Sequence, residues 1–168
     1  MLAVIETHPI QYHAPLYRSV QSQFGIEVAA IYGSDFSVVG YRDPEFGTEF
    51  AWDTDLLSGY KSVFLSRVED GGARTPEEVS FRGLSECLKR LSPRAVMIVG
   101  YSPAFHRHAF WTAWYAGYPI LFRGEATDHA QKRGVLKRWV RDCLLRLMYS
   151  RCAAILYIGP VSYTHLRA

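Results

Sequence analysis

Short runs of consecutive apolar residues recur along the whole chain, separated by stretches that contain glycine, proline and charged residues. Within a run, apolar and polar residues do not alternate. This pattern is typical of strands that are buried on both faces of a parallel sheet. It predicts strands over residues 2–6, 26–32, 61–66, 94–100, 118–124 and 152–159.

Segments with apolar residues three or four positions apart lie between most of these runs, and that spacing predicts helices. We expect helices over residues 13–23, 77–91, 103–117 and 132–151. Pro15 falls in the first helical turn, where proline is tolerated, and Gly25 and Gly117 each end a helix. Alternating strands and helices predict an α/β fold: a Rossmann-like open parallel sheet with helices on both faces.

Two segments fall outside this alternation. Residues 33–60 are long, irregular and rich in Gly, Asp, Phe and Tyr, which is typical of a functional loop or of small local structure. Residues 160–168 predict neither helix nor strand, and VSYTHLRA resembles a translated sequencing adapter. We therefore expect one native domain over residues 1–159, truncated before a further domain, and a non-native tail over 160–168.

Composition narrows the class of protein. A chain of 168 residues that is 49% hydrophobic and 21% charged is long enough for one globular domain and is not disordered. A net charge of +3 is too small to indicate a nucleic-acid partner. The three cysteines lie in apolar segments without a CxxC pair, so we expect buried free thiols in a reducing compartment. No charged leader precedes the first apolar run, and no run reaches the roughly 18 residues of a membrane span.

Polar side chains capable of chemistry gather just after three predicted strands. The three groups are Thr7, His8, Gln11, Tyr12 and His13; Tyr101, Ser102, His106 and His108; and Arg123, Glu125, Thr127, Asp128 and His129. The carboxyl ends of parallel strands share one edge of the sheet, where ligands of such folds bind. Imidazole and phenol groups donate and accept hydrogen bonds, as sugar hydroxyls do. The sequence therefore predicts a cleft for a hydroxyl-rich ligand, although each histidine taken alone is more often structural than functional.

Other kinds of site are not indicated. His106 and His108 are spaced so that their rings point in different directions on a helix, and no second ligand pair accompanies them, so we expect no metal. No GxGxxG motif and no P-loop follow the first strand, which argues against a nicotinamide or flavin cofactor. No GxSxG motif of a hydrolase is present either.

Several motifs resemble a known family. The stretches THPIQYHAPLYR, YGSDF, GYRDPEFG, FAWDTDLLSGY, GYSPAF and LFRGEATDH look like the amino-terminal half of GT-B-type glycosyltransferases of the retaining, glycogen-synthase-like family-4 group. The resemblance covers residues 1–159. It implies the acceptor-binding half of a cytoplasmic enzyme that transfers a sugar from a nucleotide-sugar donor to a glycan or lipid-linked acceptor. It also implies that a carboxyl-terminal domain binds most of the donor and that no metal or other cofactor is needed.

The resemblance implies that polar residues after the predicted strands bind the substrate. Those expected to bind substrate are His8, Gln11, Tyr12, His13, Tyr101, Arg123 and Glu125. The catalytic residue stays open, with His8 and Glu125 as candidates. Many relatives carry a histidine where this chain has Tyr101, and another near Arg123. These departures make the named residues cleft-lining groups rather than assigned catalysts.

The last predicted helix leaves two interpretations open. Its basic residues are Lys132, Arg133, Lys137, Arg138, Arg141, Arg146 and Arg151, and its apolar set is Leu136, Trp139, Val140, Cys143, Leu144 and Leu147. Such a helix either packs its apolar face on the core or lies on anionic lipid. We favour the core, while lipid-linked acceptors would favour peripheral contact with the inner membrane face. Two alternatives for the whole domain are a non-catalytic flavodoxin-like binding domain and a GT-B-like nucleotide-sugar epimerase.

Overall fold

The structure is a computed structural model that describes the chain except for residues 40, 43–48, 51–54, 125–134 and 158–168. For residues 41–42, 49–50, 135–138 and 157 it describes the backbone alone. The expected tail at 160–168 and the predicted site residue Glu125 therefore lie outside the described residues.

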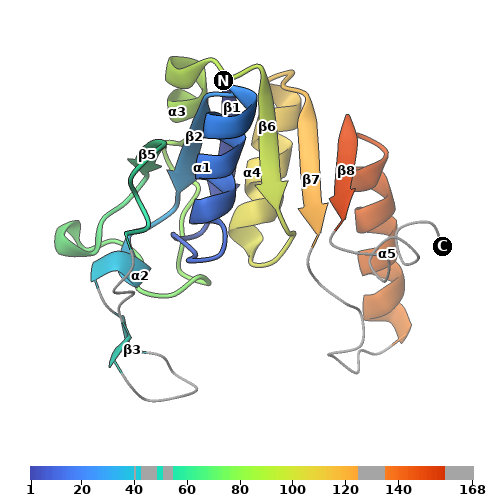
Figure 1. The fold of residues 1–168 in the computed structure, drawn as a ribbon. Helices are drawn as coiled ribbons and strands as arrows, with labels where there is room; N and C mark the ends of the chain where they lie inside the picture. Colours follow the sequence, from blue (N-terminus) through green and yellow to red (C-terminus); the bar gives the residue numbers. More distant parts are fainter. Residues whose placement is uncertain (40, 43–48, 51–54, 125–134, 158–168) are drawn as a thin grey trace.

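The described residues form a parallel sheet of six strands in the order β5-β2-β1-β6-β7-β8 (Figure 1). The strands are β1 Leu2–Glu6, β2 Val28–Tyr32, β5 Lys61–Phe64, β6 Ala95–Val99, β7 Ile120–Gly124 and β8 Ala154–Tyr157. Each falls within a predicted apolar run, which confirms the Rossmann-like open sheet. A small antiparallel pair, β3 Tyr41–Arg42 and β4 Glu49–Phe50, stands apart from the sheet within the long segment 33–60.

Helices cover both faces of the sheet. They are α1 Ala14–Phe24, α2 Phe36–Val39, α3 Leu84–Leu91, α4 Ala104–Tyr115 and α5 Val135–Tyr149, with one 3₁₀ turn, Val68–Asp70. Successive residues of β1 point to opposite faces, because side chains alternate along a strand. Val4 packs in a core cluster with Tyr17 of α1, whereas Ile5 packs in a second cluster with residues of α3 and α4.

Helix α3 starts later than the sequence pattern predicts. The expected helix over residues 77–91 begins only at Leu84, after Gly83, whose φ of 83° lies in the left-handed region. A residue in that conformation does not continue a right-handed helix, and glycine adopts it without strain. Val79 is nevertheless buried, because the turn that precedes the helix packs it against the core. The predicted start was therefore wrong, and the predicted end is confirmed.

Helix α5 packs on the core with only part of the predicted apolar set, since Leu144 lies against the core cluster. The core receives Leu145 and Met148, whereas Trp139 is 64% exposed and Val140 54% exposed. Apolar residues lie on more than one side of this helix, so spacing alone did not identify the packed side. Cys143 is exposed on α5 and Cys152 is half-buried, so only Cys87 is the buried free thiol that we expected. Among the described helices, none is long and apolar enough to cross a bilayer.

Candidate functional site

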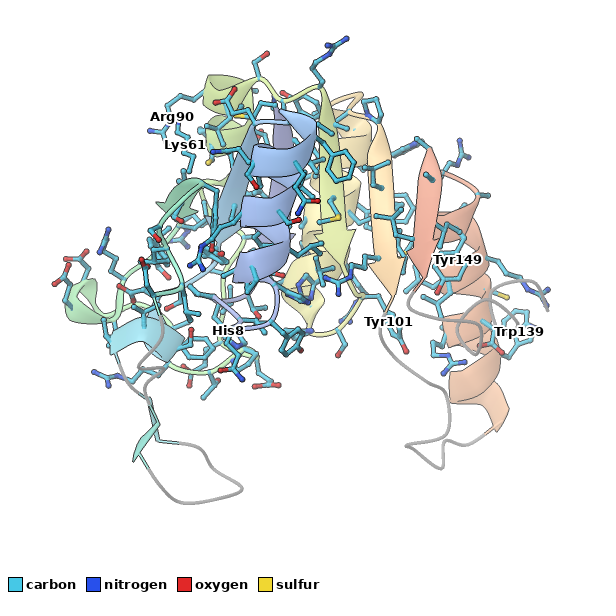
Figure 2. All side chains as sticks on the ribbon, viewed as in Figure 1. His8, Lys61, Arg90, Tyr101, Trp139 and Tyr149 are labelled. Atoms are coloured by element: carbon cyan, nitrogen blue, oxygen red, sulfur yellow. The ribbon has the colours of Figure 1, made fainter. Side chains whose placement is uncertain are left out.

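The predicted site lies at the edge of the sheet where the strands end. Figure 1 shows the carboxyl ends of β1, β6 and β7 at this edge, and Figure 2 shows His8 and Tyr101 there. We call this edge the rim, defined by the turn after β1 (residues 7–13), the turn after β6 (residues 100–103) with the first turn of α4, and the end of β7. The parallel register of β1 with β6 and of β6 with β7 brings these segments side by side.

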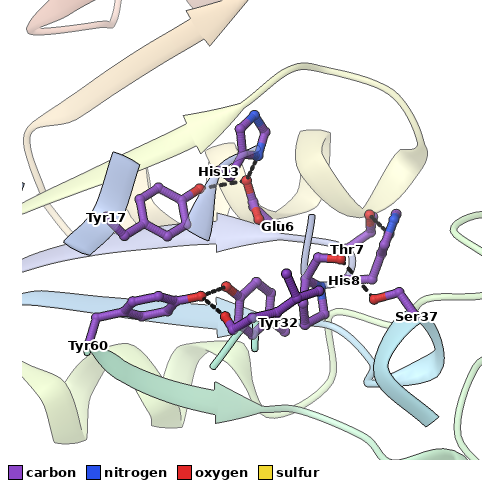
Figure 3. A network of polar contacts seen from close by, with 10 residues as sticks. Glu6, Thr7, His8, His13, Tyr17, Tyr32, Ser37 and Tyr60 are labelled. Carbon is purple, nitrogen blue, oxygen red and sulfur yellow. Dashed lines mark hydrogen bonds and ion pairs between the residues drawn. The ribbon is translucent and has the colours of Figure 1, made fainter. Parts of the chain in front are cut away.

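A buried carboxylate supports the rim from below. Glu6, the last residue of β1, is 1% exposed, and its Oε1 atom accepts a hydrogen bond of 2.6 Å from the hydroxyl of Tyr17. The same oxygen contacts Nδ1 of His13, which is fully buried just before α1 (Figure 3). Glu6 therefore ties the start of α1 to the end of β1.

A pair of tyrosine hydroxyl groups extends this support across the sheet. The hydroxyls of Tyr32 and Tyr60 lie 2.9 Å apart, and the Tyr60 hydroxyl donates to the carbonyl of Leu56 (Figure 3). Burial, together with the charge of Glu6, raises the pKa of both Tyr17 and Tyr32. Both phenols therefore stay protonated and remain donors. The segment before β5 is fixed to β2 by the same contacts.

His8 is held at the rim by two neighbours. Its Nδ1 atom lies 2.9 Å from the hydroxyl oxygen of Thr7, and its ring packs on Phe36 with the centroids 4.5 Å apart. Burial lowers the pKa of His8 to about 4, with smaller contributions from the nearby His106 and His13. The imidazole of His8 is therefore uncharged at neutral pH. An uncharged ring can accept a proton from a ligand hydroxyl.

His106 enters the same cluster from the first turn of α4. Its Nδ1 atom lies 2.9 Å from the carbonyl oxygen of Ser102, and the residue is 6% exposed. Burial lowers the pKa of His106 to about 4. The Nε2 atom is buried and has no hydrogen-bond partner among the described residues. His8, His13 and His106 thus form an imidazole cluster at the rim, joined by the electrostatic influence of His13 and His106 on His8.

The other predicted residues of the first turn differ in exposure. Gln11 is exposed, and Tyr12 is 60% exposed with its ring edge-on to His13 at 4.6 Å. His13 was expected to line the cleft, but the structure buries it completely beneath the turn. The physical reason is its contact with Glu6, which lies on the face of the sheet that α1 covers.

The predicted residues after β6 and β7 are partly buried. Tyr101 packs against the core, and its carbonyl accepts a hydrogen bond of 3.1 Å from Arg107. Arg123 is half-buried near the end of β7, beside Val99, and its charge reaches Tyr17, whose pKa it lowers slightly against the larger effect of burial. His108 lies outside the cluster, because it is exposed and stacks on Phe81 at 4.2 Å.

Sequence reasoning missed Glu6 and Tyr17, which support the cluster. The one signal available was a charged residue at the end of the apolar run LAVIE, directly before the histidine-rich turn. A carboxylate there must be buried with a partner, because leaving it unpaired in the core is costly. No group of three or more His, Cys, Asp or Glu side chains that could hold a metal occurs among the described residues.

Comparison with known proteins identifies the fold. No protein-family model matches the chain, and no curated protein matches it in sequence. A crystal structure from Listeria monocytogenes, assigned as a UDP-N-acetylglucosamine 2-epimerase, is similar with a TM-score of 0.56 and 9% identity, over 99% of this chain and 41% of that one. MurG from Acinetobacter baumannii is similar with a TM-score of 0.45 and 12% identity, over 96% of this chain and 42% of that one.

This chain thus spans less than half of the length of either neighbour. The first similarity, at 9% identity, establishes a shared fold: the chain forms a GT-B-like, Rossmann-like domain.

Proposed function

We propose that residues 1–159 are the acceptor-binding half of a GT-B-type glycosyltransferase of the retaining family-4 group. The complete enzyme would transfer a sugar from a nucleotide-sugar to a glycan or glycolipid. One observation carries the proposal: His8, in the turn after β1, and His106, in the first turn of α4, lie near each other at the carboxyl edge of a Rossmann-like sheet. Ligands of such sheets bind at this edge.

The chemistry of the rim suits a sugar. Two uncharged imidazoles offer both acceptors and donors, and the exposed ring of Tyr12 offers an aromatic face on which a sugar can stack. The first turn carries no glycine-rich motif for a pyrophosphate, which fits a half that binds the acceptor while another domain binds most of the donor. His8 is the candidate base for the acceptor hydroxyl, with Glu125 as the second candidate.

Peripheral contact with the inner face of the cytoplasmic membrane belongs to the same proposal. Trp139 and Val140 are exposed on α5, and Leu147 is 45% exposed on the same helix. The sequence of α5 is rich in Lys and Arg, with Asp142 as its one acidic residue. Exposed apolar side chains among basic ones favour an anionic lipid surface. A lipid-linked acceptor would then reach the rim from the membrane.

Binding measurements on the purified chain test the proposal. We expect the chain to bind glycan or lipid-linked acceptors in a titration panel, to bind nucleotide-sugars weakly, and to form no transfer product from the two together. Robust transfer by this chain alone would contradict the two-domain arrangement. Tight binding of UDP-N-acetylglucosamine with conversion to its 2-epimer would favour the epimerase alternative instead.

A further inference from the structure

Nε2 of His106 is a buried polar atom that the described residues leave without a hydrogen bond. Buried nitrogen and oxygen atoms in folded proteins almost always have a partner, and an exception needs an explanation. His106 is 6% exposed, so bulk solvent does not supply one freely. A bound group at the rim is one explanation.

The hydrogen-bond character of this nitrogen follows from the opposite side of the ring. Nδ1 lies 2.9 Å from the carbonyl oxygen of Ser102, and a carbonyl oxygen can only accept. The ring hydrogen is therefore on Nδ1, and Nε2 carries a lone pair. Because burial lowers the pKa of His106 to about 4, the ring does not gain a second proton near neutral pH. Nε2 thus acts as an acceptor and requires a donor.

The surroundings of His106 also suit an electronegative atom. His106 lies in the first turn of α4, a helix whose N-cap, Pro103, has no side chain that could cap it. The first backbone N–H groups of a helix attract an electronegative atom. His8, in the turn after β1, lies close enough for His106 to lower its pKa. A group bound here must donate a hydrogen bond to Nε2, which a hydroxyl does and an oxyanion without a proton does not.

We propose that His106 binds a hydroxyl group of an uncharged, hydroxyl-rich ligand. The ligand hydroxyl donates a hydrogen bond to Nε2, and it lies between His8 and the first turn of α4. The choice of a sugar as the natural ligand rests on the proposed function. The requirement for a hydroxyl rests on His106 and Ser102 alone. Because Nε2 has no solvent exposure, a neighbouring side chain moves when the ligand enters.

Nuclear magnetic resonance of the chain labelled with ¹⁵N-histidine tests the inference without any substitution. The His106 ring should show a hydrogen on Nδ1 and a bare Nε2 at neutral pH. Methyl glycosides of glucose, mannose and N-acetylglucosamine are the probes. At least one should shift the Nε2 signal towards that of a nitrogen accepting a hydrogen bond. Its fully O-methylated counterpart, also N-methylated in the case of N-acetylglucosamine, and inorganic sulfate cannot donate and should leave the signal unchanged.

A matched pair of variants tests the residue itself. His106→Asn keeps a donor for the Ser102 carbonyl and removes Nε2, so it should weaken binding of the active glycoside about tenfold. His108→Asn alters an exposed histidine of the same helix that stacks on Phe81, and it should leave the affinity unchanged. Equal binding by His106→Asn and the parent chain would overturn the inference. A hydrogen on Nε2, an unmoved signal with every glycoside, or an equal response to sulfate would do so too.

Failure of the inference can be told apart from failure of the proposed function. If a glycoside shifts the His106 signal but the chain binds none of the glycan or lipid-linked acceptors of the panel, the hydroxyl contact stands and the acceptor-binding role is wrong. If acceptors bind to the chain and His106→Asn retains their full affinity, the glycosyltransferase assignment stands and the role of His106 is wrong.

Discussion

Glu6 and His13 contact each other at the end of β1 while both are almost completely withdrawn from solvent, at 1% and 0% exposure. The pair joins the last residue of the central strand to the residue before α1. Because the turn between them carries His8 and Tyr12, the shape of the rim depends on two side chains that do not line its surface.

Replacing Glu6 should therefore destabilise the fold. Glu6→Ala removes the acceptor of the Tyr17 hydroxyl and the contact with His13 and creates a cavity, at a cost of roughly 3 kcal/mol. Tyr17→Phe removes one hydrogen bond and should cost about 1 kcal/mol. Urea unfolding of both variants measures the difference. A loss below about 0.5 kcal/mol for Glu6→Ala would show that the pair is not a structural link.

Stability should fall as the solution becomes acidic. In the unfolded chain His8 and His106 take up protons near pH 6.5, whereas in the folded protein their pKa values are lowered to about 4. Between these values the unfolded state binds more protons, so stability is full above pH 6.5 and is lost as the pH falls towards 4. Each imidazole contributes on the order of 2–3 kcal/mol to this loss.

Melting temperatures measured between about pH 7.5 and pH 4.5 check this expectation. The double variant His8→Asn/His106→Asn should show a clearly flatter dependence, because asparagine does not titrate in this range. His108→Asn is the control, since that residue is exposed on the outer side of α4 and should leave the profile as it is. Identical slopes for the double variant and the parent chain would contradict the buried, uncharged state of the two rings.

A glycine below the rim should not tolerate a larger residue. A Cβ atom on Gly33 would lie 2.0 Å from Cγ1 of Val79 and 3.2 Å from the carbonyl oxygen of Thr7. Gly33→Ala should therefore cost about 1–3 kcal/mol through overpacking. In combination with Val79→Ala, it should cost clearly less than the sum of the two single losses, as urea unfolding can measure.

The matched control for this effect is Gly25→Ala. Gly25 has a φ of 64° and no atom within 4 Å of an added Cβ, so its loss of about 1 kcal/mol comes from backbone strain alone. Val79→Ala should not reduce that loss. If Val79→Ala relieves both glycine substitutions equally, the close approach of Gly33 to Val79 is not the cause.

Activity of an enzyme that contains this domain should depend on His8 and on Glu125. His8→Ala and Glu125→Ala should each lower kcat/KM about tenfold or more, equivalent to ~1.4 kcal/mol of barrier, with little change in melting temperature. Steady-state transfer assays provide the measurement. If both variants keep full activity, or if both simply unfold, the histidine-rich turn has a structural purpose.

Lipid binding should depend on the exposed face of α5. Flotation of the chain with vesicles that contain phosphatidylglycerol should exceed flotation with purely zwitterionic vesicles, and salt should weaken it. Trp139→Ser should reduce binding several-fold. Phe24→Ser is the control, because Phe24 is 70% exposed at the end of α1, which packs in the other core cluster from α5. An equal loss of vesicle binding in both variants would indicate non-specific hydrophobic adsorption rather than a lipid-binding surface.

The fold was largely predictable because strands buried on both faces leave an uninterrupted apolar run, as LAVIE and RAVMIVG do. The start of α3 was not, because spacing does not reveal that Gly83 adopts a left-handed conformation. The packed side of α5 was not either, because Leu145 and Leu147 are equally apolar and only the first lies against the core.

The candidate site was predictable in outline. Parallel strands place the residues after β1 and β6 at one edge, so the proximity of His8 and His106 follows from topology. The burial of His13 does not follow, because it depends on where Glu6 finds its partner. A pattern of apolar and polar positions does not show whether His8 or His13 is the completely buried histidine of this turn.

The position of β1 in the middle of the sheet also determines when the rim forms during protein synthesis. Leu2 pairs with Val28 on one side, which emerges early from the ribosome, and with Ala95 on the other, which emerges only after more than half of the chain. Until then one edge of the central strand stays unpaired, and its free backbone N–H and C=O groups can pair with strands of other chains. His8 and His106 come together only when β6 closes that edge. A nascent chain of this protein therefore depends on delayed, long-range strand pairing, the step at which chaperones would act.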